Sequence, residues 1–269
     1  MPEALERDIV GRTDLPGVLA VGHSHLVSIN DAWQQAAKAA ARPGFRMAFL
    51  QLLVPEYQPL LSPQGNEVIL NPRIRRALEA LIGQQAPASI ASFVLGNEHS
   101  VFGLVNHPRR FDFALPERPD LPMEPGTEIV PYDMMRAMLG EAVKRFMVPV
   151  LSSLRRVSGL PVRHFCSPPP IGSAAHIATY PGIAAAKVRE LGVAPSALRL
   201  KLWLLYVGIV AEACAEAGGV PFVPSPVAAQ DGVGFLDEPF WSRTPTHGNQ
   251  RYGSLVLAQL AELIKAPAR

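Results

Sequence analysis

Residues 17–25 read GVLAVGHSH, and this stretch decides the fold class. The apolar run 17–22 ends at a glycine, as is typical of a strand that is buried on both faces of a parallel sheet. The sequence His23-Ser24-His25 follows, and a helix is predicted to begin near Leu26. A short buried strand, a polar turn and a helix make up the first part of a βαβ unit. We therefore expect an α/β protein.

The same alternation of strand and helix continues along the chain. Each predicted strand is a short apolar run bounded by Gly, Pro or polar residues, at 17–22, 45–53, 89–95, 162–166 and 220–223. Helices are predicted at 26–41, 72–82, 132–157, 183–191, 195–217 and 254–264. This pattern predicts a parallel sheet of about five strands with helices on both faces, and one domain over residues 1–269.

Two long segments, 55–71 and 103–131, do not fit this alternation of strands and helices. They follow the second and third predicted strands, so they are expected to leave the sheet at its carboxyl edge, where open α/β sheets bind ligands. Loops of this length are usually functional or flexible. Both segments are candidate walls of a substrate site.

Composition narrows the possible partners. The 25 Lys and Arg residues nearly balance 23 Asp and Glu residues, for a net charge of +2, so no nucleic-acid partner is expected.

The most apolar window, 198–211, contains Arg199 and Lys201 and is shorter than the roughly 20 residues of a membrane span. The N-terminus lacks the apolar core of a secretory signal, so a cytoplasmic location is expected. Cys166 and Cys214 lie in apolar stretches without metal-site spacing and are expected to be buried thiols.

Three polar residues follow the predicted strands or precede the last helix. Ser24 lies at a helix start, where free N–H groups favour an oxyanion, although serine is also a frequent helix N-cap. Asn97 in Gly96-Asn97 is able to donate to the same oxygen, although Gly-Asn is also common in turns. His247 is a suitable base for a serine nucleophile, although a lone histidine is more often structural.

Taken together, the segments around Ser24, Asn97 and His247 resemble three of the sequence blocks of the SGNH, or GDSL-like, hydrolases. Ser24 in VGHS is similar to the first block of the family, with His23 where aspartate is usual. Asn97 in LGNEH resembles the third block, and His247 in TPTHGNQRYG resembles the last. The resemblance implies a flavodoxin-like three-layer α/β/α fold. It also implies an esterase in which Ser24 attacks, His247 is the base and Asn97 donates to the oxyanion.

Two positions depart from the pattern of that family. The family usually has an aspartate three residues before the histidine, and Thr244 stands there. Asp231, Asp237 or Glu238 could replace it, or a neutral acceptor such as a backbone carbonyl could orient His247 in a Ser-His dyad, which is the interpretation we favour. The oxyanion glycine of the second block has no clear motif; we assign it to Gly65, in preference to Gly44.

The resemblance implies a small-molecule or carbohydrate ester as substrate, and neither a cofactor nor a metal ion. Three alternatives stay open on the sequence alone: an acyltransferase that uses the same acyl-enzyme, a metal-dependent hydrolase built on His23 and His25, and an inactive binding protein with this fold. The sequence does not indicate an oligomeric state.

Overall fold

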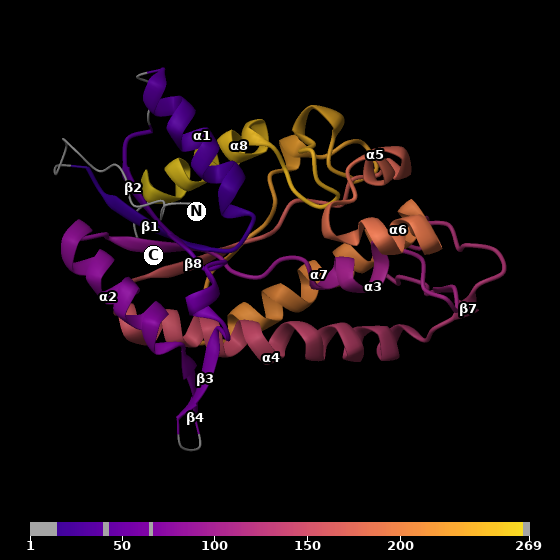
Figure 1. Ribbon diagram of the computed structural model, residues 1–269, viewed down its shortest axis with the longest axis horizontal. Helices are drawn as coiled ribbons and strands as arrows, with labels where there is room; N and C mark the ends of the chain where they lie inside the picture. The colour runs from indigo at the N-terminus through magenta and orange to yellow at the C-terminus, as the bar shows by residue number, and fades with distance from the viewer. Residues whose placement is uncertain (1–14, 40–42, 65–66, 266–269) are drawn as a thin grey trace.

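A computed structural model describes residues 15–39, 43–64 and 67–265 (Figure 1). At its centre is a sheet of five parallel strands, in the order β2-β1-β5-β8-β9. Its strands are β1 (Gly17–Gly22), β2 (Arg46–Gln51), β5 (Ser89–Phe93), β8 (Val162–Phe165) and β9 (Phe222–Val223). All five predicted strands are confirmed, the first at its predicted bounds.

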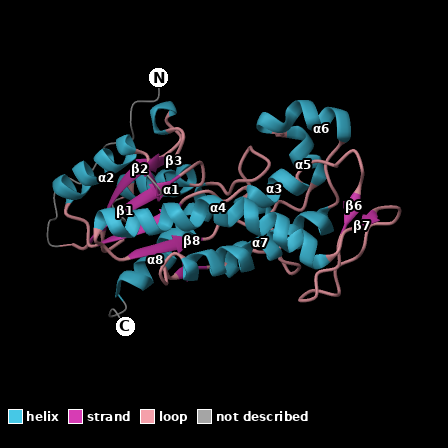
Figure 2. Ribbon diagram, turned by 90° about the horizontal axis from the view of Figure 1, so that it is seen from below, coloured by secondary structure: helices cyan, strands magenta, loops and turns pink. Residues whose placement is uncertain are grey.

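Helices cover both faces of this sheet (Figures 1 and 2). Leu19 and Val21 of β1 belong to one core cluster, with residues of α2 (Pro72–Gln85), α4 (Tyr132–Ser158) and α7 (Ser196–Glu216). Their neighbours Val18 and Ala20 point to the other face, where α1 (Leu26–Lys38) and α8 (Gln250–Lys265) pack. Successive strand residues face opposite sides, so one apolar run supplies both cores. The three-layer α/β/α architecture is therefore confirmed.

The predicted helices agree with the structure apart from their ends and a few short additions. Helix 183–191 is split into η2 (Gly182–Ala184) and α6 (Ala185–Leu191), and the last helix begins at Gln250, four residues earlier than predicted. Unpredicted elements are α3 (Glu98–Gly103), α5 (Ala174–Thr179), and the short helical turns η1 (Pro55–Tyr57), η3 (Val227–Ala229) and η4 (Glu238–Phe240). The long α4 and α7 run side by side, and within the described residues no helix is both long and apolar enough to span a bilayer.

The segment 55–71 contains more regular structure than its sequence suggests. β3 (Leu61–Gln64) and β4 (Glu67–Leu70) form an antiparallel ladder that projects below α4 in Figure 1. Leu61 and Leu70 are paired at its base, and Leu70 is buried in the core. Packing against α4 therefore stabilises a hairpin whose strands are too short to be recognised from pattern alone.

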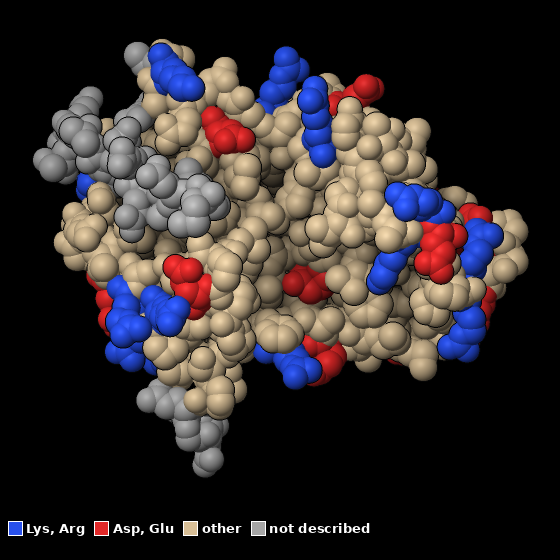
Figure 3. Space-filling model, viewed as in Figure 1, with Lys and Arg blue, Asp and Glu red and all other residues tan. Residues whose placement is uncertain are grey.

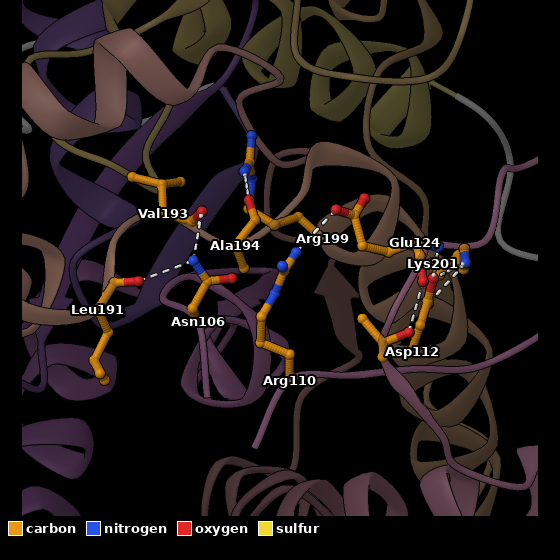
Figure 4. Close-up of polar contacts among 10 residues, drawn as sticks. Asn106, Arg110, Asp112, Glu124, Leu191, Val193, Ala194, Arg199 and Lys201 are labelled. Carbon is orange, nitrogen blue, oxygen red and sulfur yellow. Dashed lines mark hydrogen bonds and ion pairs between the residues drawn. The ribbon is translucent and has the colours of Figure 1, made fainter. Parts of the chain in front are cut away.

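The segment 103–131 is joined to α7 by a buried ion pair (Figure 4). It contains the short strands β6 (Phe111–Asp112) and β7 (Glu128–Ile129), which pair in parallel. The Lys201 ammonium donates to both Asp112 carboxylate oxygens, at 2.8 and 2.9 Å, and both side chains are 1% exposed. Asp112 also accepts the backbone N–H groups of Phe113 and Glu124. One carboxylate thus links Phe113 and Glu124 of this segment to Lys201 of α7.

Candidate active site

The order of the strands creates a natural ligand site between β1 and β5. Chain connections leave these two neighbouring strands in opposite directions along the sheet, and ligands bind in open α/β folds at such a switch point, beyond the carboxyl ends of the strands. Ser24 follows β1 and Asn97 follows β5. A Cβ added to Gly22 would lie 2.4 Å from the carbonyl oxygen of Phe93. Glycine therefore allows the two strand ends to approach closely.

Ser24 and His247 are in direct contact across 223 positions of sequence. The Oγ of Ser24 lies 2.7 Å from Nε2 of His247, which is within hydrogen-bonding distance. The residue at the N-cap position of α1 is His25, and its side chain makes no capping hydrogen bond. The Ser24 hydroxyl thus faces the imidazole rather than the first turn of the helix.

Tight packing of α1 against α8 brings the two residues together. Each residue shortly precedes one of these helices, and a Cβ on Gly253 of α8 would lie 2.0 Å from the carbonyl oxygen of Ser28 of α1. Asn249, immediately before α8, accepts the N–H of Arg251 and donates to the carbonyl oxygens of Pro239 and Trp241. The segment Asn249 to Gly253 therefore fixes the position of the His247 loop relative to Ser24.

A strained turn places Asn97 at the same edge. Leu95 and Gly96 both have positive φ angles, 61° and 118°, and such a conformation is costly for leucine. Two side chains hold the turn: Nδ1 of His23 accepts the Leu95 N–H at 2.9 Å, and the Glu98 carboxylate accepts the Gly96 N–H at 3.1 Å. Burial lowers the pKa of His23 to about 4, so its ring is neutral at pH 7. With Nδ1 as acceptor, the single ring proton lies on Nε2.

His25 lies between the base and the asparagine. Its ring centroid is 4.8 Å from that of His247, and a Cβ on Gly96 would lie 2.8 Å from its Nε2. Burial lowers the pKa of His25 well below its usual range, the proximity of His247 lowers it further, and the Asn97 side chain partly offsets both effects. Nε2 of His25 and Oδ1 of Asn97 are buried without a well-formed hydrogen bond. The ring is therefore neutral and close-packed.

Hydroxyl groups face the far side of the His247 ring. Oγ1 of Thr244 lies 2.9 Å from Nδ1, and Oγ1 of Thr246 lies 3.3 Å from the same atom. Asp231 instead accepts the N–H groups of residues 233–235, and Asp237 accepts the N–H of Glu238, whose own side chain is exposed. Burial lowers the pKa of His247 below its usual value.

Three other sequence predictions concern the oxyanion glycine, a metal site and the two cysteines. Gly65 lies outside the described residues, so its assignment as an oxyanion donor stays a prediction, and Gly44 precedes β2. Among the residues that the structure does describe, no three His, Cys, Asp or Glu side chains group as metal ligands. Nδ1 of His23 is already engaged by Leu95. Cys166 and Cys214 are free and buried, as predicted.

Figure 3 shows one face of the molecule, which is hollowed near its middle. An acidic side chain is visible in this hollow, and most other charged side chains lie around the outside of the face, with the two signs interspersed. No large patch of one sign is visible there.

Comparison with known proteins finds no matching family model and no matching curated protein. Among solved structures, the chain is similar to the periplasmic domain of a lipopolysaccharide acetyltransferase from Salmonella ser. Paratyphi A, with 8% identity, a TM-score of 0.49, and 95% and 85% of the two chains covered. Two further solved structures are also similar to the chain. A GDSL-like lipase from Bacteroides thetaiotaomicron has 13% identity and a TM-score of 0.44, covering 93% and 87%. Phospholipase A1 from Streptomyces albidoflavus has 12% identity and a TM-score of 0.36, covering 92% and 99%. Similarity at this level concerns overall architecture alone, and the function has to be argued from the site.

Proposed function

We propose that this protein is a serine esterase that hydrolyses a small carboxylic ester through an acyl-enzyme on Ser24. The 2.7 Å contact between Ser24 Oγ and His247 Nε2 carries this proposal. A serine hydroxyl is a weak nucleophile until a neighbouring base accepts its proton, and this geometry supplies such a base.

The reaction takes place in two halves. Nε2 of His247 removes the Ser24 proton while Oγ bonds to the ester carbonyl carbon, and the carbonyl oxygen becomes an oxyanion. The Ser24 N–H and the Asn97 amide are the proposed donors to that oxygen. The tetrahedral species collapses, the C–O bond to the alcohol breaks, and His247 gives its proton to the departing alcohol. Water, deprotonated by His247, then attacks the acyl carbon; the bond between this carbon and Ser24 Oγ breaks, His247 returns its proton to Oγ, and the acid is released.

The test is turnover of p-nitrophenyl acetate by the wild type, by Ser24→Ala and by Ser254→Ala. Removal of the nucleophile is expected to lower kcat by at least about 10³-fold. Ser254 is exposed on α8 and its hydroxyl donates to the Gln250 carbonyl oxygen of the same helix, so the control variant should keep wild-type activity. Equal thermal unfolding of the three proteins would show that folding is intact. Wild-type turnover in Ser24→Ala would disprove the assignment.

A chelator separates this proposal from the metal-dependent alternative. The serine mechanism predicts full activity after dialysis against EDTA. Loss of activity that zinc or manganese restores would instead favour a metal enzyme built on His23 and His25.

A further inference from the structure

Ser242 and Thr244 form a chain of hydroxyl groups behind the His247 ring, which we call the hydroxyl relay. Oγ of Ser242 lies 2.8 Å from the backbone oxygen of His247 and 2.9 Å from Oγ1 of Thr244. Oγ1 of Thr244 in turn lies 2.9 Å from Nδ1 of His247 and 3.3 Å from its backbone nitrogen. The relay starts and ends on the same histidine.

Counting protons assigns a direction to this chain. A carbonyl oxygen only accepts, so Ser242 must donate its single proton to the His247 oxygen. The contact between the two hydroxyls then requires Thr244 to donate to Ser242. Having used its proton, Thr244 can only accept from the ring, and Nδ1 must therefore carry the hydrogen. The reverse direction would leave Ser242 Oγ and the His247 oxygen as two acceptors at 2.8 Å.

We infer that the hydroxyl relay replaces the acid of a Ser-His-Asp triad by fixing the tautomer of His247 without a charge. This inference rests on the proposed esterase function. With hydrogen on Nδ1, the lone pair of Nε2 points at the Ser24 hydroxyl, as general-base catalysis requires. Ser242 and Thr244 are positioning residues, because they act only through the imidazole.

An uncharged relay has a second consequence, for pH dependence. A hydroxyl orients the imidazole but does not stabilise the imidazolium as a carboxylate would, so nothing in the relay opposes the fall in the pKa of His247 that burial causes. Activity requires the neutral base and falls as pH drops through this pKa. The acidic limb of the pH–activity profile should therefore have its midpoint below about 6.5, the ordinary pKa of histidine. His25 contacts the His247 ring, and His23 and His99 act electrostatically on His25; Glu98 accepts the N–H of the nearby Gly96, and His176 contacts the backbone oxygen of Ser242 in the relay.

Burial holds the pKa values of three of these neighbours below the ordinary value of histidine. Burial lowers the pKa of His23 to about 4 and that of His99 to about 3, and it lowers the pKa of His25 well below its usual range. His176 reaches the relay only through the backbone oxygen of Ser242, at 2.9 Å. Burial raises the pKa of the Glu98 carboxyl, so this group also changes its charge on the acidic side.

The tautomer can be measured directly by ¹⁵N NMR of the imidazole nitrogens in the full-length protein. Signals of His247 are assigned by difference from a His247→Gln variant, and a pH above the acidic limb is used. The expected result is a protonated Nδ1 and an unprotonated Nε2 in the wild type, with mixed tautomers in the double variant Thr244→Val/Thr246→Val, which removes both hydroxyls that face Nδ1. A wild-type ring with hydrogen on Nε2 would overturn the relay. Because no turnover is needed, this result is independent of the esterase proposal.

Kinetics give the second readout, with p-nitrophenyl acetate as the probe. Thr244→Val keeps the shape but removes the acceptor, and kcat is expected to fall about 10- to 100-fold with little change in KM. Thr244→Ser restores the hydroxyl and should recover activity to within about threefold of the wild type. Thr244→Asp supplies a charge and should move the acidic limb upward. Unchanged kcat in a folded Thr244→Val, or no upward shift in a folded, active Thr244→Asp, would contradict the inference.

Discussion

The Lys201→Met variant tests how much the buried ion pair with Asp112 stabilises the segment 103–131. The variant leaves the Asp112 carboxylate buried with two backbone N–H donors, at 2.7 and 2.8 Å, and without its cation. Removing one member of a buried ion pair typically costs about 3–5 kcal/mol, since the remaining charge is uncompensated. Folded domains are stable by only about 5–15 kcal/mol, so this loss is large.

Urea unfolding measures this loss, with Lys144→Met as the matched control. Lys144 pairs with Glu212 and Glu216 on the surface, where an ion pair is worth at most about 1 kcal/mol. The double variant Lys201→Met/Asp112→Asn should regain part of the stability, because the amide still accepts a backbone N–H and carries no charge. Equal free energies of unfolding for Lys201→Met and Lys144→Met would refute this reasoning.

Three further predictions concern the site. Asn97→Ala should lower kcat for p-nitrophenyl acetate by about 10²- to 10³-fold with little change in KM, and weaker binding at unchanged kcat would instead make Asn97 a substrate contact. Asp237→Asn should change kcat less than threefold, because this carboxylate caps η4 rather than approaching His247; a loss of several hundredfold in the folded variant would identify it as the triad acid. Gly96→Ala should destabilise the turn by about 1–3 kcal/mol, given its φ of 118° and the 2.8 Å approach to His25, and an unchanged melting temperature would contradict that geometry.

The sequence predicts the sheet well because each central strand is buried on both faces. Such strands read as continuous apolar runs, and the run 17–22 is correct at both ends. The hairpin of β3 and β4 is different: its strands have four residues each and include Pro63, and its stability comes from packing on α4. Local pattern does not contain that tertiary contact.

The candidate site likewise contains residues that the sequence identifies and contacts that it does not. Ser24, Asn97 and His247 are identifiable because each borders a regular element whose position the fold determines. The group that contacts Nδ1 of His247 is not identifiable from the sequence, because it depends on the path of the loop 241–248. Trp241 and Gly248 at the ends of this loop form a short antiparallel bridge. The spacing of Ser242 and Thr244 is the one sequence signal of the hydroxyl relay, and its meaning requires the folded loop.

Mass spectrometry after treatment with a fluorophosphonate tests the central claim most directly, because this reagent modifies activated serine nucleophiles. The wild type should carry one adduct, on the peptide that contains Ser24. Labelling should be lost in Ser24→Ala and strongly slowed in His247→Gln. An unlabelled wild type, an adduct on another serine, or equally fast labelling of His247→Gln would contradict the assignment of Ser24 and His247 as nucleophile and base.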